Sequence, residues 1–244
     1  MSDEQMAGKS NLDTAFFGHP KGLQTLFFTE MWERMSYYGM RAMLVLFMTA
    51  SLQEQGLAFT VASAAAIYGL YTGAVYFLGL PGGWLSDRLF GGQKTVWYGG
   101  IIIMCGHIIL AIPHPSSFFI GLIFVATGTG LLKPNISAMV GQLYKSEDER
   151  RDSGYAIYYM GINLGALIAG VVSGSVTTEF GWKAGFVAAG IGMLISLVMQ
   201  MTFAQAWLGD IGRVPAAKRD LAIKKSSQKE PLTKEETDRI KVIL

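Results

Sequence analysis

The chain has 244 residues, of which 51% are hydrophobic and 16% are charged, with a formal net charge of +2 and a mean hydropathy of +0.34. Soluble domains carry about 25% charged residues, and the apolar residues here gather into runs close to the roughly 20 residues that cross a bilayer. The composition therefore predicts an all-α integral membrane protein in a lipid bilayer. It argues against a soluble α/β enzyme, and we expect no nucleic-acid partner.

The chain divides into three predicted regions. Residues 1–20 are polar and lack the apolar core of a cleaved signal peptide, so they are predicted to form a cytoplasmic N-terminal tail. Residues 21–208 are predicted to form a six-helix transmembrane bundle, with spans at about 23–50, 59–85, 95–112, 118–144, 155–177 and 182–208. Residues 209–244 mix Lys with Asp and Glu. They predict a charged cytoplasmic linker, partly helical, that leads towards a second half; a membrane-surface helix is the alternative.

The basic residues sort between the two sides of this predicted bundle. Outside the spans, every Lys and Arg except Lys183 falls on the side that carries both chain ends. Loops rich in Lys and Arg stay in the cytoplasm. The pattern predicts a multi-pass protein of the cell (inner or plasma) membrane with both ends of this chain cytoplasmic.

Four charged residues interrupt the first apolar span: Glu30, Glu33, Arg34 and Arg41. Each charge at a helix centre costs about 2.5–3.5 kcal/mol on insertion scales. At 100° per residue, the four fall with Tyr37 and Tyr38 within an arc of about 140°. Glu30 and Arg34 are also spaced to touch along the helix. This polar face predicts a functional site inside the bundle; the alternative is a self-neutralising pair that only joins helices.

The fourth span carries one charge, Lys133, followed by Pro134, which is expected to kink the helix. A buried ammonium needs a carboxylate, and Glu30 and Glu33 are the other acids deep within a span. Two acids against three cations leave one positive charge in excess, which could hold the carboxylate of a substrate.

Other spans carry weaker patterns. Polar ladders at i, i+4, i+8 run through Tyr68, Thr72 and Tyr76, and through Tyr155, Tyr159 and Asn163; a mid-span amide must find partners. The small-residue pairs Gly161/Gly165 and Gly170/Gly174 predict close helix contacts. His107 is predicted to pack rather than carry protons. No metal-ligand cluster, Ser-His-Asp set or phosphate loop occurs in the sequence, and Cys105 is its single cysteine.

Three ordered motifs together resemble the proton-dependent oligopeptide transporter family of the major facilitator superfamily. The first runs from Glu30 to Gly39, with Met35 where the family usually has Phe; the second is Gly82-Gly83-Trp84-Leu85-Ser86-Asp87-Arg88; the third runs from Tyr155 to Ala166. The resemblance covers about residues 20 to 208. It implies the first half of a 12- or 14-helix fold built from 3+3 inverted repeats.

The resemblance implies a proton-coupled symporter, not an enzyme, that imports di- and tripeptides by alternating access without a cofactor beyond the proton. It implies a proton-coupling network of Glu30, Glu33, Arg34 and Lys133. It implies peptide contacts from Arg34, Tyr37, Tyr38, Arg41, Tyr76, Lys133 and Asn163. Asp87 and Arg88 would form a gating or structural loop. A C-terminal six-helix half would be the partner and would bind the peptide's amino end.

Two other functions stay open from the residues themselves. A symporter of the same fold could carry nitrate, amino acids or drugs, because cations on the cavity wall suit any anionic group. Alternatively, a membrane receptor could bind peptide without moving it across the bilayer.

Overall fold

A computed structural model describes residues 13–112 and 114–227. Within these ranges it contains no strand beyond one isolated bridge between Phe16 and His19. The elements are α2 (Lys21–Thr49), α3 (Val61–Leu85), the π-helical turn η1 (Ser86–Phe90), α4 (Gly92–Leu110), α5 (Pro115–Gln142), α6 (Arg150–Trp207) and α7 (Ala216–Ser227).

The longest helix, α6, consists of two segments. Gly181 has φ 81° and ψ 177°, outside helical geometry, and it lies between the predicted spans at 155–177 and 182–208. With this break, the long helices supply the six predicted spans. Three stretches are long and apolar enough by themselves to cross a membrane: Val61–Phe90, Pro115–Gln142 and Arg150–Trp207. The fold is an all-α, membrane-spanning bundle.

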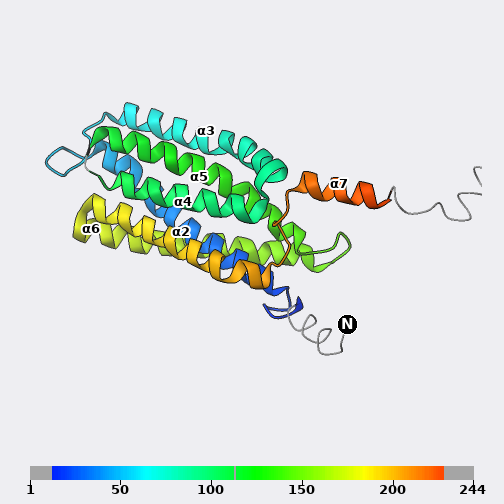
Figure 1. Ribbon diagram of the computed structural model, residues 1–244. Helices are drawn as coiled ribbons and strands as arrows, with labels where there is room; N and C mark the ends of the chain where they lie inside the picture. Colours follow the sequence, from blue (N-terminus) through cyan, green and yellow to red (C-terminus); the bar gives the residue numbers. More distant parts are fainter. Residues whose placement is uncertain (1–12, 113, 228–244) are drawn as a thin grey trace, which may run out of the picture.

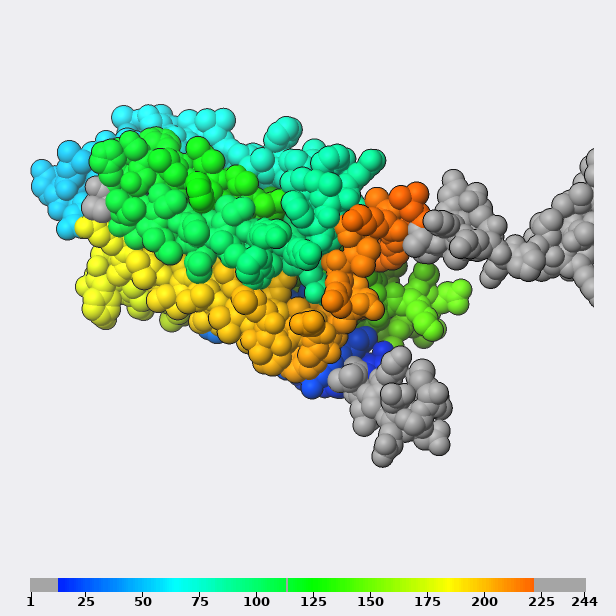
Figure 2. All heavy atoms as spheres, in the orientation of Figure 1, coloured from blue at the N-terminus to red at the C-terminus, as the bar shows by residue number. Residues whose placement is uncertain are grey.

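The long helices run side by side in an elongated bundle, with α3 along one flank and α6 along the other (Figure 1). The main packing pairs are α2 with α6, α5 with α3 and α4, and α4 with α6. The start of α2 and the whole of α7 lie at one end, called the linker end below, where α7 projects from the bundle (Figure 2). The connection between α2 and α3 lies at the opposite end.

Two buried apolar clusters fill the bundle. One includes Met40, Phe47, Phe118 and Phe186, and the other includes Leu23, Ile103, Met139 and Leu197. On α2 the first cluster begins at Tyr37 and the second ends at Leu26, so the helical turns between them carry Glu30, Glu33 and Arg34. These three charged side chains therefore sit at mid-height of the bundle, between two apolar layers.

Several helix limits differ from those predicted. α6 begins at Arg150 rather than near residue 155, because Asp148 Oδ1 accepts hydrogen bonds from both the backbone N and Nε of Arg150 at 3.0 Å. The turn η1 extends α3, so the expectation that Asp87 and Arg88 occupy a loop is wrong: both lie in this helical turn. The chain reverses only at Gly91, whose φ of 80° suits glycine.

The predicted linker is helical in part, because α7 covers Ala216–Ser227. Residues 228–244 of that predicted region, like most of the predicted N-terminal tail, lie outside the described residues. His107 is fully buried, and its Nε2 lies 2.9 Å from the Ser36 hydroxyl of α2. This placement agrees with the packing role expected for it.

Candidate functional site

The two acids of α2 converge on one guanidinium. Arg34 Nε donates a hydrogen bond to Glu30 Oε1 at 2.7 Å and lies 2.7 Å from Glu33 Oε2. All three side chains are at most 2% exposed. The i,i+4 contact between Glu30 and Arg34 is the one that helical spacing predicted, and Glu33 adds a second carboxylate to the same cation. The cluster therefore holds one more negative than positive charge.

This cluster has unused hydrogen-bonding capacity. Among the described residues, Glu30 Oε2, both oxygens of Glu33 and Arg34 Nη2 are buried and make no hydrogen bond. An unsatisfied buried charge is expensive. A proton added to either acid would remove a negative charge and supply a donor. Arg34 Nη2 could in turn donate to an incoming anionic group.

Glycines on α6 let that helix approach the cluster. A Cβ added at Gly165 would lie 2.9 Å from Arg34 Cβ, and one added at Gly161 would lie 3.1 Å from the carbonyl oxygen of Phe27. The predicted close contact is therefore confirmed for this pair. It is wrong for Gly170 and Gly174, where a Cβ would meet nothing within 4 Å in the described part of the chain.

The sequence reasoning missed Tyr158. This residue of α6 is 2% exposed, and the charges of Glu30, Arg34 and Glu33 act on its hydroxyl. The signal was available: Tyr158 stands within the motif from Tyr155 to Ala166, one position before the ladder residue Tyr159. The ladder spacing selected Tyr159 instead, which is 55% exposed.

A second group forms around Arg41, two turns along α2. Its Nε donates a hydrogen bond to the Tyr68 hydroxyl of α3, and its guanidinium lies 5.1 Å from the Tyr68 ring centre. The Arg41 guanidinium also lies 6.0 Å from the ring centre of Tyr37, and the Arg34 guanidinium lies 5.3 Å from the same ring centre. Tyr37 thus connects the two arginines, and Tyr68 is a further member that was not assigned to the site.

Arg41 opens onto a pocket of about 350 Å³. It lies between α2, α3 and the first segment of α6, and its lining consists of Tyr38, Arg41, Ala42, Tyr68, Ala166, Ala169 and Gly170. Two predicted substrate contacts, Tyr38 and Arg41, therefore share one accessible surface. Gly170 leaves room in this pocket rather than closing a helix contact.

Lys133 does not make the expected ion pair. Within residues 13–112 and 114–227, no carboxylate lies within 4.0 Å of its ammonium. Instead, Lys133 Nζ lies over the Tyr76 ring, 4.7 Å from its centre. A cation over an aromatic face is stabilised without losing its charge. This contact brings together two predicted substrate residues, from α5 and α3.

The remaining predicted residues stand apart. Asn163 lies on an exposed face of α6, where its Nδ2 donates to the backbone oxygen of Tyr159 at 3.0 Å. The hydrogen-bond partner that a mid-span amide requires is thus supplied by its own helix. Asp87 and Arg88 are exposed near the linker end, with Arg88 6.0 Å from the Trp84 ring centre.

Comparisons with known proteins agree on one family. Residues 93–207 match the family model described as "PTR2: POT family". The chain is 50% identical over 198 residues to an uncharacterized transporter, YclF, of Bacillus subtilis, covering 81% of this chain and 40% of that protein. It is 43% identical over 224 residues to a di-/tripeptide transporter of Lactococcus lactis subsp. cremoris, covering 91% of this chain and 45% of that protein.

Solved structures give the same result. A crystal structure of a peptide transporter POT in complex with sulfate superposes with a TM-score of 0.81 at 43% identity, covering all of this chain and 47% of that one. The chain thus spans less than half the length of these relatives. From the matched family model, the shared sequence and the shared helical bundle, we conclude that this chain belongs to the POT family of transporters.

Proposed function

We propose that this chain forms one six-helix half of a proton-coupled symporter that imports di- and tripeptides by alternating access. The observation that carries the proposal is the buried cluster in which Glu30 and Glu33 share Arg34. Relatives named di-/tripeptide transporters support the choice of substrate. A second six-helix half would complete the cavity and bind the peptide's amino end.

The proposed coupling is an exchange of partners within the cluster. While both carboxylates are ionised, they hold Arg34 between them. A proton bound by Glu30 or Glu33 cancels one negative charge and weakens that hold, because the attraction between buried charges is strong. The Arg34 guanidinium then has donors available for the peptide's carboxylate. Release of the proton restores the original pairing and expels the substrate.

The other cations would complete the substrate surface. Arg41, with Tyr38 in the same pocket, would hold the carboxylate end of the peptide, and Lys133 over Tyr76 would approach it from α5. Tyr37 would transmit changes between Arg34 and Arg41, since both guanidinium groups lie near its ring. Asn163 would contact the peptide backbone from α6. The proton would be the coupling ion, with no other cofactor.

The orientation is part of the proposal. The linker end carries most of the Lys and Arg residues, including Lys94, Lys145, Arg151 and Arg213, whereas Lys183 lies at the other end. We place the linker end in the cytoplasm and the bundle in the cell membrane. Asp87 and Arg88 would then stabilise the cytoplasmic face in one of the two access states.

The test is pH-driven uptake of a labelled dipeptide into proteoliposomes that contain this chain together with a second six-helix half. Glu30→Gln and Glu33→Gln should each abolish accumulation against a gradient. Glu179→Gln, an exposed acid near the turn at Gly181, is the matched control and should accumulate normally. The proposal is wrong if both cluster variants still concentrate the dipeptide when driven by pH.

Competition separates the alternative functions. Unlabelled di- and tripeptides should block uptake, whereas nitrate and free amino acids should not. Block by nitrate or amino acids would favour a symporter for those substrates. Saturable binding without accumulation by the unmodified protein would favour a peptide receptor.

A further inference from the structure

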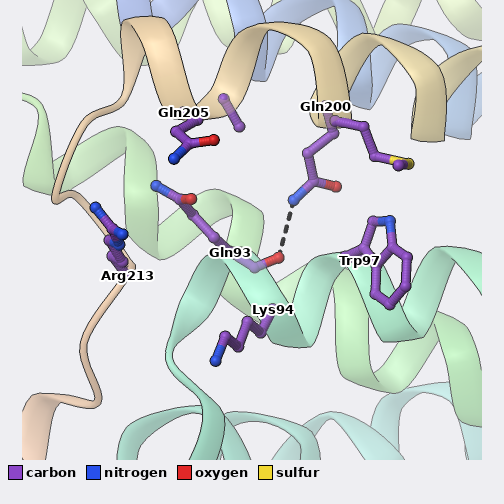
Figure 3. Close-up of a pocket in the computed structure, with 8 residues that line it drawn as sticks. Gln93, Lys94, Trp97, Gln200, Gln205 and Arg213 are labelled. Carbon is purple, nitrogen blue, oxygen red and sulfur yellow. Dashed lines mark hydrogen bonds between the residues drawn. The ribbon is translucent and has the colours of Figure 1, made fainter.

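A separate cavity of about 240 Å³ lies at the linker end, between α4 and the second segment of α6. It is lined by Gln93, Lys94, Trp97, Gln200, Met201, Ala204, Gln205 and Arg213 (Figure 3). None of these residues comes from α3 or from the first segment of α6, which line the Arg41 pocket. The cavity therefore has no part in the proposed transport site.

The walls of this cavity are held by hydrogen bonds. Gln93 Nε2 donates to the backbone oxygens of Gly209 at 3.1 Å and Ile211 at 2.7 Å, and Gln93 N donates to the oxygen of Gly212 at 2.9 Å. Gln200 Nε2 donates to the backbone carbonyl oxygen of Gln93 at 3.0 Å (Figure 3). The segment after α6 is thus fixed against the start of α4, which positions Arg213 beside the cavity.

Two cations lie at one end of the cavity and an indole at the other. Figure 3 shows Arg213 beside the amide end of the Gln93 side chain, Lys94 on the side of Gln93 away from Gln205, and Trp97 one turn further along α4. Both cations are exposed. The nearest described carboxylate to Arg213 is Asp210, at 3.7 Å and 95% exposed; Lys94 forms no ion pair with a described residue. Exposed pairs of this kind contribute little, so both cations can bind an anion.

Beyond Trp97 the surface becomes apolar. Ile191, Leu194, Val198 and Met201 recur at helical spacing on α6, and each is 47–63% exposed. Met201 also lines the cavity, so this stripe, called the α6 stripe below, begins where the cavity ends. Indole rings favour the boundary between lipid head groups and hydrocarbon. From the linker end, the surface thus presents cations, then an indole, then the α6 stripe. This order matches the phosphate, the head-group boundary and the acyl chains of a phospholipid.

We propose that this cavity binds the phosphodiester head group of an anionic phospholipid, with an acyl chain along the α6 stripe. Lys94 and Arg213 would bind the phosphate, and Gln205 would donate to head-group oxygens. Basic pockets between transmembrane helices are suited to such head groups. The volume is smaller than the 300–1,000 Å³ or so of sites for drug-sized ligands, and it suits a head group alone. A soluble phosphate would leave the stripe unused.

The experiment is native mass spectrometry of the purified chain in detergent, titrated with phosphatidylglycerol or phosphatidylcholine. We expect tighter binding of phosphatidylglycerol. Lys94→Gln with Arg213→Gln should weaken phosphatidylglycerol binding by about 25-fold, since each cation near anionic lipid contributes roughly a factor of five. Lys145→Gln with Arg151→Gln removes the same charge from the exposed α5–α6 junction and should leave binding unchanged.

Two further arms separate rival explanations. Lys94→Arg with Arg213→Lys keeps both positive charges and should retain binding. That result would mean that the glutamine pair lost binding through the missing charge and not through a change in the fold. Brominated phosphatidylglycerol should quench fluorescence of the original chain more than that of Trp97→Phe. Equal weakening in both glutamine pairs, displacement of the lipid by millimolar inorganic phosphate, or quenching independent of Trp97 would each overturn the proposal.

Discussion

Gly165 of α6 lies directly against Arg34 of α2, so closely that a Cβ at position 165 would stand 2.9 Å from Arg34 Cβ and would also overlap the carbonyl oxygen of Met31. Backbone and Cβ atoms cannot move aside as a side-chain end can. The glycine therefore sets the distance between α6 and the charged cluster. It also brings the α6 face that carries Tyr158 next to Glu30.

We predict that Gly165→Ala destabilises the bundle by about 1–3 kcal/mol, the usual cost of overpacking. Peptide uptake should also fall, because the separation of the helices displaces Arg34. Gly170→Ala is the matched control, since its Cβ would meet nothing within 4 Å. Thermal unfolding in detergent measures the stability of both variants. Equal melting temperatures would show that α6 does not depend on the contact at position 165.

Removal of the cation from the cluster should be more severe. Arg34→Met leaves Glu30 and Glu33 buried with no opposite charge within 4.0 Å among the described residues. Loss of one partner from a buried ion pair costs about 3–5 kcal/mol. The triple variant Glu30→Gln, Glu33→Gln, Arg34→Met removes all three charges and should recover most of that stability. Denaturant unfolding would compare the free energies of unfolding of the two variants. A triple variant no more stable than Arg34→Met would contradict the ion pairing of Arg34 with Glu30 and Glu33.

The turn before α2 should respond to pH. His19 Nδ1 lies 2.9 Å from the Tyr144 hydroxyl, and Asp148 and Arg150 face the same imidazole. Burial, and then the positive charge of Arg150, lower the pKa of His19. Burial raises the pKa of Tyr144 to about 12, so that hydroxyl keeps its proton.

Because the folded state lowers the pKa of His19, the stabilisation of this turn is complete above the unfolded value of about 6.5 and is lost as pH falls through the folded value. The protection factors of the Phe16 and His19 amides, whose backbone groups bond each other at 3.1 and 2.9 Å, should fall over that range. His19→Gln should remove the pH dependence. His114→Gln, at an exposed site, should preserve it.

Two glycines with the same unusual backbone allow a direct comparison. Gly91 and Gly181 have φ of 80° and 81° with ψ of 158° and 177°, a region nearly restricted to glycine. Alanine at Gly181 should cost about 1–3 kcal/mol for backbone strain alone, since nothing lies within 4 Å. Alanine at Gly91 should cost more, because its Cβ would also lie 2.8 Å from the carbonyl oxygens of Gly212 and Arg213.

Thermal unfolding of Gly91→Ala and Gly181→Ala checks this difference. Native mass spectrometry adds a second readout, because the segment after α6 carries Arg213 of the lipid cavity. Gly91→Ala should weaken phosphatidylglycerol binding and Gly181→Ala should not. The reverse order of stabilities would mean that the contact between Gly91 and this segment contributes nothing.

Local sequence patterns were enough to predict the six apolar spans, the break between residues 177 and 182 and the polar face of α2. Hydropathy and the 3.6-residue period depend only on neighbouring residues. For the same reason, the contact between Glu30 and Arg34 was predictable, since i and i+4 always adjoin on a helix. The three motifs led to the family.

Contacts between helices could not be predicted in this way, because they depend on how each helix is rotated and on how closely it approaches its neighbours in the folded bundle. Charge alone would allow Lys133 to form an ion pair with Glu30 or Glu33. The packing of α5 on α3 instead places its ammonium over the Tyr76 ring. Gly161/Gly165 and Gly170/Gly174 have the same spacing, yet only the first pair faces α2. Tyr158 reaches the cluster and Tyr159 does not, since adjacent helical positions point about 100° apart.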